Sequence, residues 1–378
     1  MIYLDNSATT KPDEEVLKTF YSVSTHFFAN PSSIHHAGSD VEKLLNKAKE
    51  QIAKLLNIRS EEVIFTSGGT ESNNLAIKGV AYQYKNRGNH IITSQIEHPS
   101  VLEVCKQLEN EGYKVTYLPV DENGQINIDE FKASLTDDTI LVSLMHVNNE
   151  VGSIQPIEEV AKIIKQYPKV VFHVDHVQGF GKIPLKYDLD DIHLITISGH
   201  KIHGLKGTGC LIKKQSIRLQ PLFQGGSQEH GYRPGTENVA GAVSIAKAIR
   251  LATENEKNYK NLFKLKEKLH DRLSKMDHVT MNSPKTGAAH IINFSVKNFK
   301  PEVLIHALGE KNIFVSTKSA CSSKINEPSH VLLAMTKDEK IASSAIRVSM
   351  HLNQKEEDID IFLSELQQII KKYEHIMG

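Results

Sequence analysis

The sequence lacks several features that would mark particular classes of protein. Its 378 residues include only three cysteines, Cys105, Cys210 and Cys321, and no two of them form a Cys-x-x-Cys pair. This argues against a disulfide framework and against a zinc site built from cysteine alone, and it favours a reducing cytoplasm. None of the 19 histidines belongs to a His-x-x-x-His pair on a clear helix, so the histidines do not predict a metal site.

Net charge and long hydrophobic runs are lacking too. Lysine plus arginine and aspartate plus glutamate number 45 each, so nothing in the charge indicates a nucleic-acid or membrane partner. No apolar run is long enough to span a bilayer, and the first residues lack the basic and apolar regions of a signal peptide. With 39% hydrophobic and 24% charged residues, the composition predicts a soluble globular protein of about two domains.

What the sequence does contain is an alternation of short apolar runs with helical patterns. The runs predicted as buried strands lie at 63–65, 91–93, 140–144, 170–174 and 193–197. Strands that alternate with helices form βαβ units. We therefore expect an α/β fold with a mainly parallel sheet and flanking helices.

The pattern changes after Gly241. A long helical stretch carries leucines at helical spacing from Leu262 to Leu273, and a last helix shows the same spacing between Ile359 and Ile370. We expect a large domain over residues 16–257, and a smaller α+β domain formed by residues 1–15 and 258–378.

Lys201 ends the run Ser198-Gly199-His200-Lys201, which directly follows the strand predicted at 193–197. Burying an ammonium group is costly, and a desolvated lysine tends to become neutral. A neutral lysine amine forms Schiff bases with aldehydes, and pyridoxal phosphate is the common protein-bound aldehyde. A single lysine after a strand is more often a solvent-exposed residue. The hypothesis therefore needs partner residues elsewhere in the chain.

Asp175 and Gln178 are candidates to hold the ring of such a cofactor. Ligands of open α/β sheets bind at the carboxyl ends of strands, and Asp175 directly follows the strand at 170–174. Its carboxylate could pair with a pyridinium nitrogen, and Gln178 could bond the ring hydroxyl oxygen. Taken alone, such an aspartate is more often a helix cap or loop residue, and such a glutamine is more often a surface residue.

Gly68-Gly69-Thr70 is a candidate phosphate site. The glycines allow close approach of the backbone to an anion, and the helix that follows offers N–H groups and a positive dipole. Ser198 and His200 could complete the site. The alternative is a tight turn with a threonine cap, and the motif is not a Walker loop because no Lys-Ser/Thr pair follows.

His98 and Arg347 complete the candidate set. His98 precedes Pro99 at a predicted helix start, where its ring could stack on a flat cofactor and exchange protons. Arg347 lies in the strand-like stretch 344–349 and could hold a substrate carboxylate through two hydrogen bonds. Each has an ordinary alternative, a capping histidine and a salt-bridge arginine, and only the convergence of the candidates favours function.

Cys321 lies in a small, polar segment between Lys318 and Lys324. Neighbouring lysines favour the nucleophilic thiolate, whereas a structural cysteine prefers apolar neighbours. We therefore predict a functional role for Cys321. Cys105 and Cys210 lie in apolar helix and strand patterns and are predicted to be core residues.

Together these segments resemble the cysteine desulfurases, which are pyridoxal-phosphate enzymes of the class V aminotransferase group with the type I fold. The resemblance covers nearly the whole chain. It is carried by Tyr3–Asn6, Asn30–Ser33, Thr66–Asn74, Glu97–His98, Val147–Glu150, Ser198–Lys201, Arg233–Asn238, the Cys321 segment and Arg347.

The resemblance implies a role for each candidate. Lys201 would carry the cofactor and move protons, and His98 would stack on the ring and act in acid–base steps. Asp175 and Gln178 would hold the ring nitrogen and ring oxygen. The phosphate contacts would come from Gly69, Thr70, Ser198 and His200, with Thr236 from the second subunit of a homodimer, and Gly199 would also bind the cofactor.

The resemblance also implies the reaction. Asn148 and Arg347 would fix the carboxylate of L-cysteine, with Asn148 also near the cofactor, and Cys321 would attack the substrate sulfur to leave L-alanine and a persulfide. The segment around Cys321 resembles the long-loop branch, which passes sulfur to an acceptor protein. That acceptor would belong to an iron–sulfur, tRNA-thiolation or thiamine pathway.

The sequence departs from the family pattern at a few positions. Lys318 stands where glycine is usual, Leu205 where proline is usual, and His176 where a small residue is common, and 350–353 departs from the usual Leu-Gly run. Two alternatives remain open. One is a related pyridoxal-phosphate lyase or aminotransferase, such as a selenocysteine lyase, and the other is a non-catalytic sulfur-relay scaffold.

Overall fold

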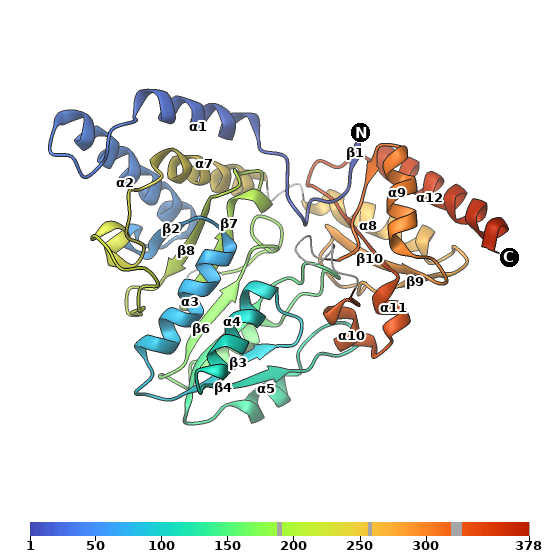
Figure 1. Cartoon of the computed structure of the whole chain (residues 1–378), viewed down its shortest axis with the longest axis horizontal. Helices are drawn as coiled ribbons and strands as arrows, with labels where there is room; N and C mark the ends of the chain where they lie inside the picture. Colours follow the sequence, from blue (N-terminus) through green and yellow to red (C-terminus); the bar gives the residue numbers. More distant parts are fainter. Residues whose placement is uncertain (187–190, 256–258, 319–326, 378) are drawn as a thin grey trace.

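The computed structural model describes residues 1–186, 191–255, 259–318 and 327–377. Figure 1 shows two bodies side by side. One holds most of the N-terminal two-thirds of the chain, and the other holds the C-terminal third, coloured orange to red, together with the N-terminus itself. The predictions for Cys321 and its segment fall outside the described residues.

A seven-stranded sheet forms the centre of the larger body. Its strand order is β2-β8-β7-β6-β5-β3-β4, and all neighbours pair in parallel except β8, which is antiparallel to both β2 and β7. The strands are β2 (Val63–Thr66), β3 (His90–Ser94), β4 (Lys114–Leu118), β5 (Thr139–Met145), β6 (Val171–Asp175), β7 (Leu194–Ser198) and β8 (Gly209–Lys213). The predicted α/β fold with a mainly parallel sheet is thus confirmed.

Helices cover both faces of this sheet. Alternate residues of one strand point to opposite faces, so Val63 and Phe65 join one core while Ile64 joins the other. The helices of the first face are α2 (His36–Leu56), α5 (Ile128–Ser134), α6 (Ile157–Ile164) and α7 (Val239–Asn255), and those of the second are α3 (Gly69–Gln83) and α4 (Pro99–Asn110). Helix α1 (Glu14–His26) packs on α7.

Local sequence signals set the ends of several helices. Asp13 caps α1, because its Oδ1 accepts the amide hydrogen of Glu15 at 2.7 Å. Helix α2 begins at His36, because the His35 side chain caps it by accepting the amide hydrogen of Gly38. Asn57 follows the last residue of α2 and has a φ of 54°, a left-handed conformation that asparagine tolerates.

The smaller body is built on an antiparallel sheet of order β12-β10-β9 and a parallel pair of β1 and β11. Its core joins Leu4 to residues of the C-terminal third, such as Leu262, Phe294, Ile346 and Phe362. Its elements are β1 (Ile2–Tyr3), α8 (Tyr259–Leu273), β9 (Val279–Met281), β10 (Ile291–Val296), α9 (Pro301–Glu310), β11 (Ile313–Phe314), α10 (His330–Thr336), α11 (Glu339–Ser343), β12 (Ala345–Ser349) and α12 (Glu356–Met377). The predicted domain boundaries stay a prediction.

The two bodies meet where the N-terminal segment 5–10 crosses from one to the other (Figure 1). The amide of Asn6 donates to the carbonyl of Ser349 in β12, whereas the amide of Thr10 donates to the carbonyl of His200 after β7. A second contact joins Met145 and Ile96 of the large body to Leu332 and Met335 of α10. The sequence segments of the predicted site lie along this junction.

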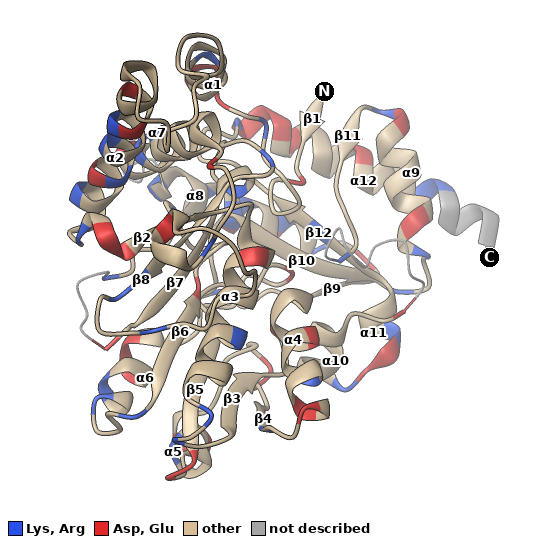
Figure 2. Ribbon diagram, turned by 60° about the vertical axis from the view of Figure 1, so that its left-hand side comes forward, with Lys and Arg blue, Asp and Glu red and all other residues tan. Residues whose placement is uncertain are grey.

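Acidic and basic segments interleave over the helices of both bodies (Figure 2), in keeping with the net charge of +0. None of the helices in the described ranges combines the length and the apolar character that crossing a membrane would need.

Core packing in the small body should dominate its stability. Phe362 is fully buried in α12, whereas Phe263 on α8 is 46% exposed. We expect Phe362→Ala to lower the free energy of unfolding by about 3–5 kcal/mol, because it removes a buried ring and leaves a cavity. Phe263→Ala should change it by less than about 1 kcal/mol. Urea unfolding of the two variants checks this, and equal losses would contradict the packing described.

Candidate functional site

A cavity opens at the junction, beside the carboxyl ends of β5, β6 and β7 and the first turns of α3 and α4. Many predicted site residues line it, together with residues that the sequence analysis did not select. The predicted ones are Gly69, Thr70, His98, Asp175, Gln178, Ser198, His200, Lys201 and Arg347, and the additional ones include Ser7, Ala8, Asn73, Ser100 and Asn149.

Lys201 reaches the cavity from the 3₁₀ turn Gly199–Lys201, which directly follows β7. Its Nζ donates to the carbonyl oxygens of Ser7 and Ala8, the second at 2.9 Å. These acceptors are neutral carbonyls on the crossing segment, and they hold the amine in place. The partly buried amine therefore stands at the wall where an aldehyde could reach it.

Asp175 stands at the end of β6 and is nearly fully buried. Its Oδ2 accepts from Asn73 Nδ2 at 2.8 Å, and its Oδ1 accepts from the amide of Val177 at 3.0 Å. Burial raises the pKa of Asp175, while these hydrogen bonds and the charge of Lys201 oppose the rise. A carboxylate with this limited compensation gains from a cationic partner in the cavity, such as a protonated ring nitrogen.

The end of the cavity at α3 suits a phosphate. Gly68 has φ of +152°, which is open only to glycine, and α3 starts at the next residue without a side-chain cap. Within the described ranges, the buried Oγ of Ser198 has no hydrogen-bond partner. A Cβ at Gly69 would lie 3.1 Å from Val177 Cγ2 and reduce this space.

Two residues predicted to bind the cofactor, Gly199 and Thr236, are not among the residues that line the cavity. Gly199 is a packing residue, because an added Cβ would lie 2.2 Å from Thr208 Oγ1. Thr236 is exposed and is not among the residues of its own chain's cavity. Its predicted contact with the cofactor of a second subunit stays a prediction.

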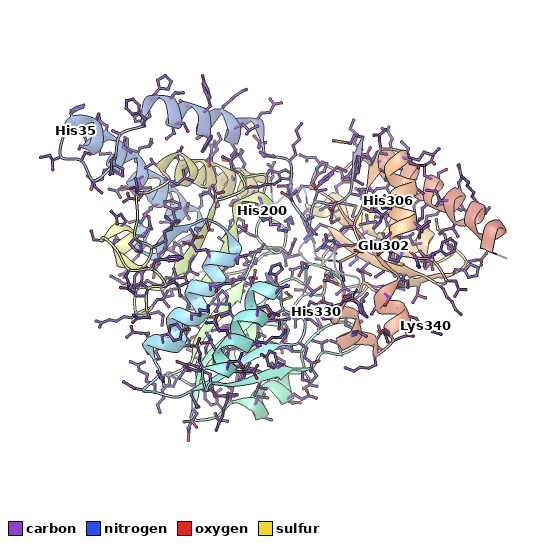
Figure 3. All side chains as sticks on the ribbon, in the orientation of Figure 1. His35, His200, Glu302, His306, His330 and Lys340 are labelled. Atoms are coloured by element: carbon purple, nitrogen blue, oxygen red, sulfur yellow. The ribbon has the colours of Figure 1, made fainter. Side chains whose placement is uncertain are left out.

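His98 and His200 face the cavity as neutral rings. Burial lowers the pKa of each to about 4, and the charge of Lys201 adds to the effect. His98 is also the N-cap of α4, since its Nδ1 accepts the amide hydrogen of Ser100 at 3.1 Å. Figure 3 shows His200 and His330 near the junction of the two bodies, whereas His35 and His306 lie far from it.

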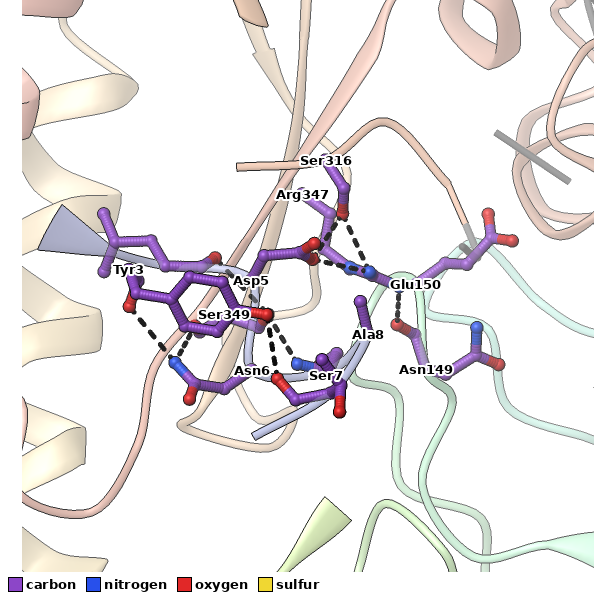
Figure 4. A network of polar contacts seen from close by, with 12 residues as sticks. Tyr3, Asp5, Asn6, Ser7, Ala8, Asn149, Glu150, Ser316, Arg347 and Ser349 are labelled. Atoms are coloured by element: carbon purple, nitrogen blue, oxygen red, sulfur yellow. Dashed lines mark hydrogen bonds and ion pairs between the residues drawn. The ribbon is translucent and has the colours of Figure 1, made fainter. Parts of the chain in front are cut away.

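Arg347 is almost completely buried on β12 and takes part in a network that spans the junction (Figure 4). Its Nη2 donates to Asp5 Oδ1 at 3.0 Å and Ser316 Oγ at 2.8 Å, and its Nη1 donates to the carbonyl of Asn149 at 2.8 Å. The guanidinium is thereby fixed at the cavity wall with its charge balanced by Asp5. Such a group can orient a substrate carboxylate.

The structure corrects the prediction for Asn148. This side chain is fully buried and serves its own turn, because its Oδ1 accepts the amide hydrogens of Glu150 and Val151 and its Nδ2 donates to the carbonyl of Ile96. The neighbouring Asn149 lines the cavity instead. The doublet Asn148-Asn149 was the sequence signal for this position, but the sequence alone did not tell which asparagine faces inward.

Asn73, Ser100 and Ser7 were not predicted. Asn73 and Ser100 belong to α3 and α4, and both adjoin motifs that the sequence analysis had already selected. Ser7 supplies a carbonyl that accepts from both Lys201 and Gln178, a backbone role that no side-chain signal reveals. The two other cysteines, Cys105 and Cys210, are buried core residues, as predicted.

The segment that should carry Cys321 is described only at its two ends. On one side, Ser316 bonds Arg347 and Asp5, which places the start of the segment beside the cavity. Lys318, which stands at a position where glycine is usual, is buried and donates to the carbonyl of Glu327. The lysine thus links the two described ends of the segment.

Comparison with known proteins agrees with this geometry. The family model for class-V aminotransferases matches residues 2–362. The chain belongs to this family. It is 44% identical to the cysteine desulfurase IscS of Dictyoglomus turgidum, over 98% of this chain and 95% of the relative.

Two further proteins are similar to this chain over nearly its whole length. The chain is 43% identical to a NifS/IcsS protein homologue of Lactobacillus delbrueckii subsp. bulgaricus, over 100% of this chain and 99% of the relative. The solved structure of a NifS-like protein superposes with a TM-score of 0.92 at 37% identity, covering 98% of this chain and 99% of that chain.

Class-V aminotransferases and cysteine desulfurases depend on pyridoxal phosphate, and the residues of the cavity fit this cofactor. Its phosphate would fit at the start of α3, which has no side-chain cap, in the space at Gly69. The Oγ of Ser198, which has no hydrogen-bond partner in the described ranges, could donate to it. The buried Asp175 suits its ring nitrogen, and the amine of Lys201 suits its aldehyde. The cofactor would therefore be held by these residues and by the start of α3.

Glu97, the residue before His98, is a fully buried carboxyl group whose pKa lies well above its ordinary value. Its Oε1 accepts from Ser94 Oγ at 2.7 Å and from the amide of Met145 at 2.9 Å. Burial raises its pKa to about 8, the two hydrogen bonds oppose this, and the charge of Asp175 adds to the rise. The folded protein therefore keeps a proton on Glu97 at pH values where the unfolded chain has lost it.

This proton makes stability depend on pH. Between the ordinary value of 4.5 and about 8, the folded state binds more protons than the unfolded state, so stability falls as pH rises. The proton on Glu97 should make the free energy of unfolding fall by up to about 1.4 kcal/mol for each pH unit in this window. We expect Glu97→Gln to remove this contribution. Urea unfolding at two pH values inside this window checks it, with the exposed Glu122→Gln as control. Equal pH dependence of wild type and Glu97→Gln would contradict the assignment.

Proposed function

We propose that this protein is a pyridoxal-phosphate-dependent cysteine desulfurase, which converts L-cysteine to L-alanine and leaves the sulfur on Cys321. The observation that carries the proposal is the convergence of Lys201, Asp175, His98 and Arg347 on one cavity. Relatives named cysteine desulfurase at 42–44% identity over 98% of the chain support it.

The residues around the cavity have separate roles in the proposed reaction. Pyridoxal phosphate, when bound, withdraws electrons from the bonds of the amino acid attached to it. Lys201 supplies the amine that accepts and returns protons beside the carbonyls of Ser7 and Ala8. Arg347 and Asn149 would hold the substrate carboxylate, and Asp175 would keep a proton on the ring nitrogen.

Sulfur transfer then needs only Cys321 and one proton. The Cys321 thiolate attacks the sulfur of the substrate, and an S–S bond forms as the bond between that sulfur and Cβ breaks. The electron pair stays on Cβ, which takes a proton and becomes the methyl group of alanine. Cys321 is left as a persulfide, and no external oxidant is required.

The proposal includes a homodimer. Large apolar side chains are exposed along α1 and the segment that follows it, and Tyr21, Phe28 and Ile34 are at least 71% exposed. An apolar surface of this kind indicates an interaction site. We propose that a second copy covers it and that Thr236 of the partner subunit reaches the phosphate end of the cavity.

The proposal also includes a protein acceptor for the persulfide sulfur. The candidates are proteins of the iron–sulfur, tRNA-thiolation and thiamine pathways. A persulfide needs a reducing compartment in which other thiols do not form disulfides, so we place the protein in the cytoplasm. The buried, unpaired state of Cys105 and Cys210 agrees with this.

The role of Arg347 leads to a kinetic prediction. Arg347→Lys keeps the charge but loses the planar pair of donors, so we expect KM for L-cysteine to rise roughly 10- to 100-fold with a smaller change in kcat. Arg250→Lys on α7, where the arginine pairs with Glu254 away from the cavity, is the matched control. An unchanged KM in Arg347→Lys would remove Arg347 from substrate binding.

Alanine release from L-cysteine in the presence of a thiol reductant tests the function. We expect wild type and the control Cys105→Ala to release alanine, and Cys321→Ser to lose more than about 99% of turnover because the nucleophile is gone. Equal release by Cys321→Ser would favour a lyase related to selenocysteine lyase. Absence of release from cofactor-loaded wild type would favour a sulfur-relay scaffold.

A further inference from the structure

A chain of hydrogen bonds runs beneath the cavity from Asp175 to His98. Asn73 Nδ2 lies 2.8 Å from Asp175 Oδ2 and 2.9 Å from Ser100 Oγ. Ser100 Oγ in turn lies 2.8 Å from Nδ1 of His98. Asn73 and Ser100 are buried and both line the cavity, so the chain is shielded from solvent except at its cavity side.

The direction of each bond follows from the chemistry of the groups. A carboxylate only accepts, so Asn73 must present its amide nitrogen to Asp175, since the reverse orientation would place two oxygens together. The same nitrogen then donates its second hydrogen to Ser100 Oγ. The hydroxyl hydrogen of Ser100 is left to point at the next acceptor, which is Nδ1 of His98.

His98 Nδ1 therefore receives two hydrogens, because the backbone amide of Ser100 donates to it as well, at 3.1 Å. A ring nitrogen that accepts cannot carry a hydrogen itself. In the neutral imidazole the single ring hydrogen must then be on Nε2. Nδ1 is the atom turned toward Ser100, so Nε2 is the atom left for a cavity ligand.

We propose that Asn73 and Ser100 are positioning residues that hold the ring hydrogen of His98 on Nε2, so that His98 meets the bound molecule as a hydrogen-bond donor rather than as a base. The inference rests on the proposed function only for the identity of that molecule. Lys201 is then the group on the cavity wall that accepts protons from the substrate. Asn73 links the two ends, because its one amide group fixes both Asp175 and the Ser100 hydroxyl.

The surroundings of His98 keep its ring neutral, so the position of the single hydrogen determines what it can do. Burial is the largest cause that lowers the pKa of His98 to about 4. The charges of Lys201 and His330 lower it further, and the charge of Glu150 opposes the shift. The titratable groups that act on the ring from the packed elements are Lys201 and His200 after β7, His330 of α10 and Glu150 after β5. Asp175 of β6 is linked to the ring through Asn73 and Ser100.

Nuclear magnetic resonance of the ring nitrogens tests the proposal on the full-length holoenzyme with ¹⁵N-labelled histidine. The His98 signals are identified by their loss in His98→Gln. We expect Nε2 to carry hydrogen and Nδ1 to show the shift of an accepting nitrogen. In Ser100→Ala the pKa of His98 should rise by about 0.5–1 unit, because the neutral ring loses a hydrogen bond.

Two matched variants sharpen the test. Ser100→Thr keeps the hydroxyl and should behave like wild type. Ser72→Ala removes a buried hydroxyl from the same helix as Asn73, but that hydroxyl bonds Thr66, so the His98 signals should not change. A hydrogen on Nδ1 in wild type, or an unchanged His98 pKa in Ser100→Ala, would overturn the proposal.

Asn73→Asp provides a second route if Ser100→Ala does not fold. An aspartate at 73 accepts instead of donating, so the Ser100 hydroxyl should turn to it, and the His98 pKa should rise at least as far as in Ser100→Ala. No rise in a folded Asn73→Asp protein would also overturn the proposal. These measurements need no turnover, so loss of alanine release with the expected His98 signals would refute the function and leave this inference standing.

Discussion

The burial of the Asp175 carboxylate is the constraint on which the site depends. A charge at the end of an interior strand must be matched by donors or by a cation. Asn73 and the amide of Val177 supply part of this, and the pyridine nitrogen of the cofactor would supply the rest. The same amide group of Asn73 donates to Asp175 and to the Ser100 hydroxyl. The carboxylate of Asp175 and the position of the ring hydrogen on His98 are therefore linked through Asn73.

The N-terminal segment gives this site its second wall. Residues 5–10 leave the small body, hydrogen-bond β12 and the turn after β7, and place two carbonyls against the amine of Lys201. Asp5 from the same segment balances the charge of Arg347. A short crossing segment therefore positions both the amine that would hold the cofactor and the guanidinium that would hold the substrate. Separating the two bodies would disturb both at once.

Much of this could be predicted from the sequence, because the period of the apolar runs fixes the strands and the strand ends gather the polar residues. Lys201 and Asp175 were found in this way, whereas His98 was selected at a helix start and Arg347 within a strand-like stretch. The choice between Asn148 and Asn149 could not be predicted, since one residue in a turn reverses the direction of a side chain. The antiparallel direction of β8 and the roles of Asn73 and Ser100 depend on tertiary contacts, which a local pattern does not contain.

The central claim is that sulfur from L-cysteine comes to rest on Cys321. Mass spectrometry of peptides from the protein, treated with L-cysteine without reductant and alkylated before digestion, tests it most directly. The account predicts that the Cys321 peptide gains the mass of one sulfur atom while the Cys105 and Cys210 peptides remain unchanged. An unmodified Cys321 peptide from protein that has released alanine would contradict it.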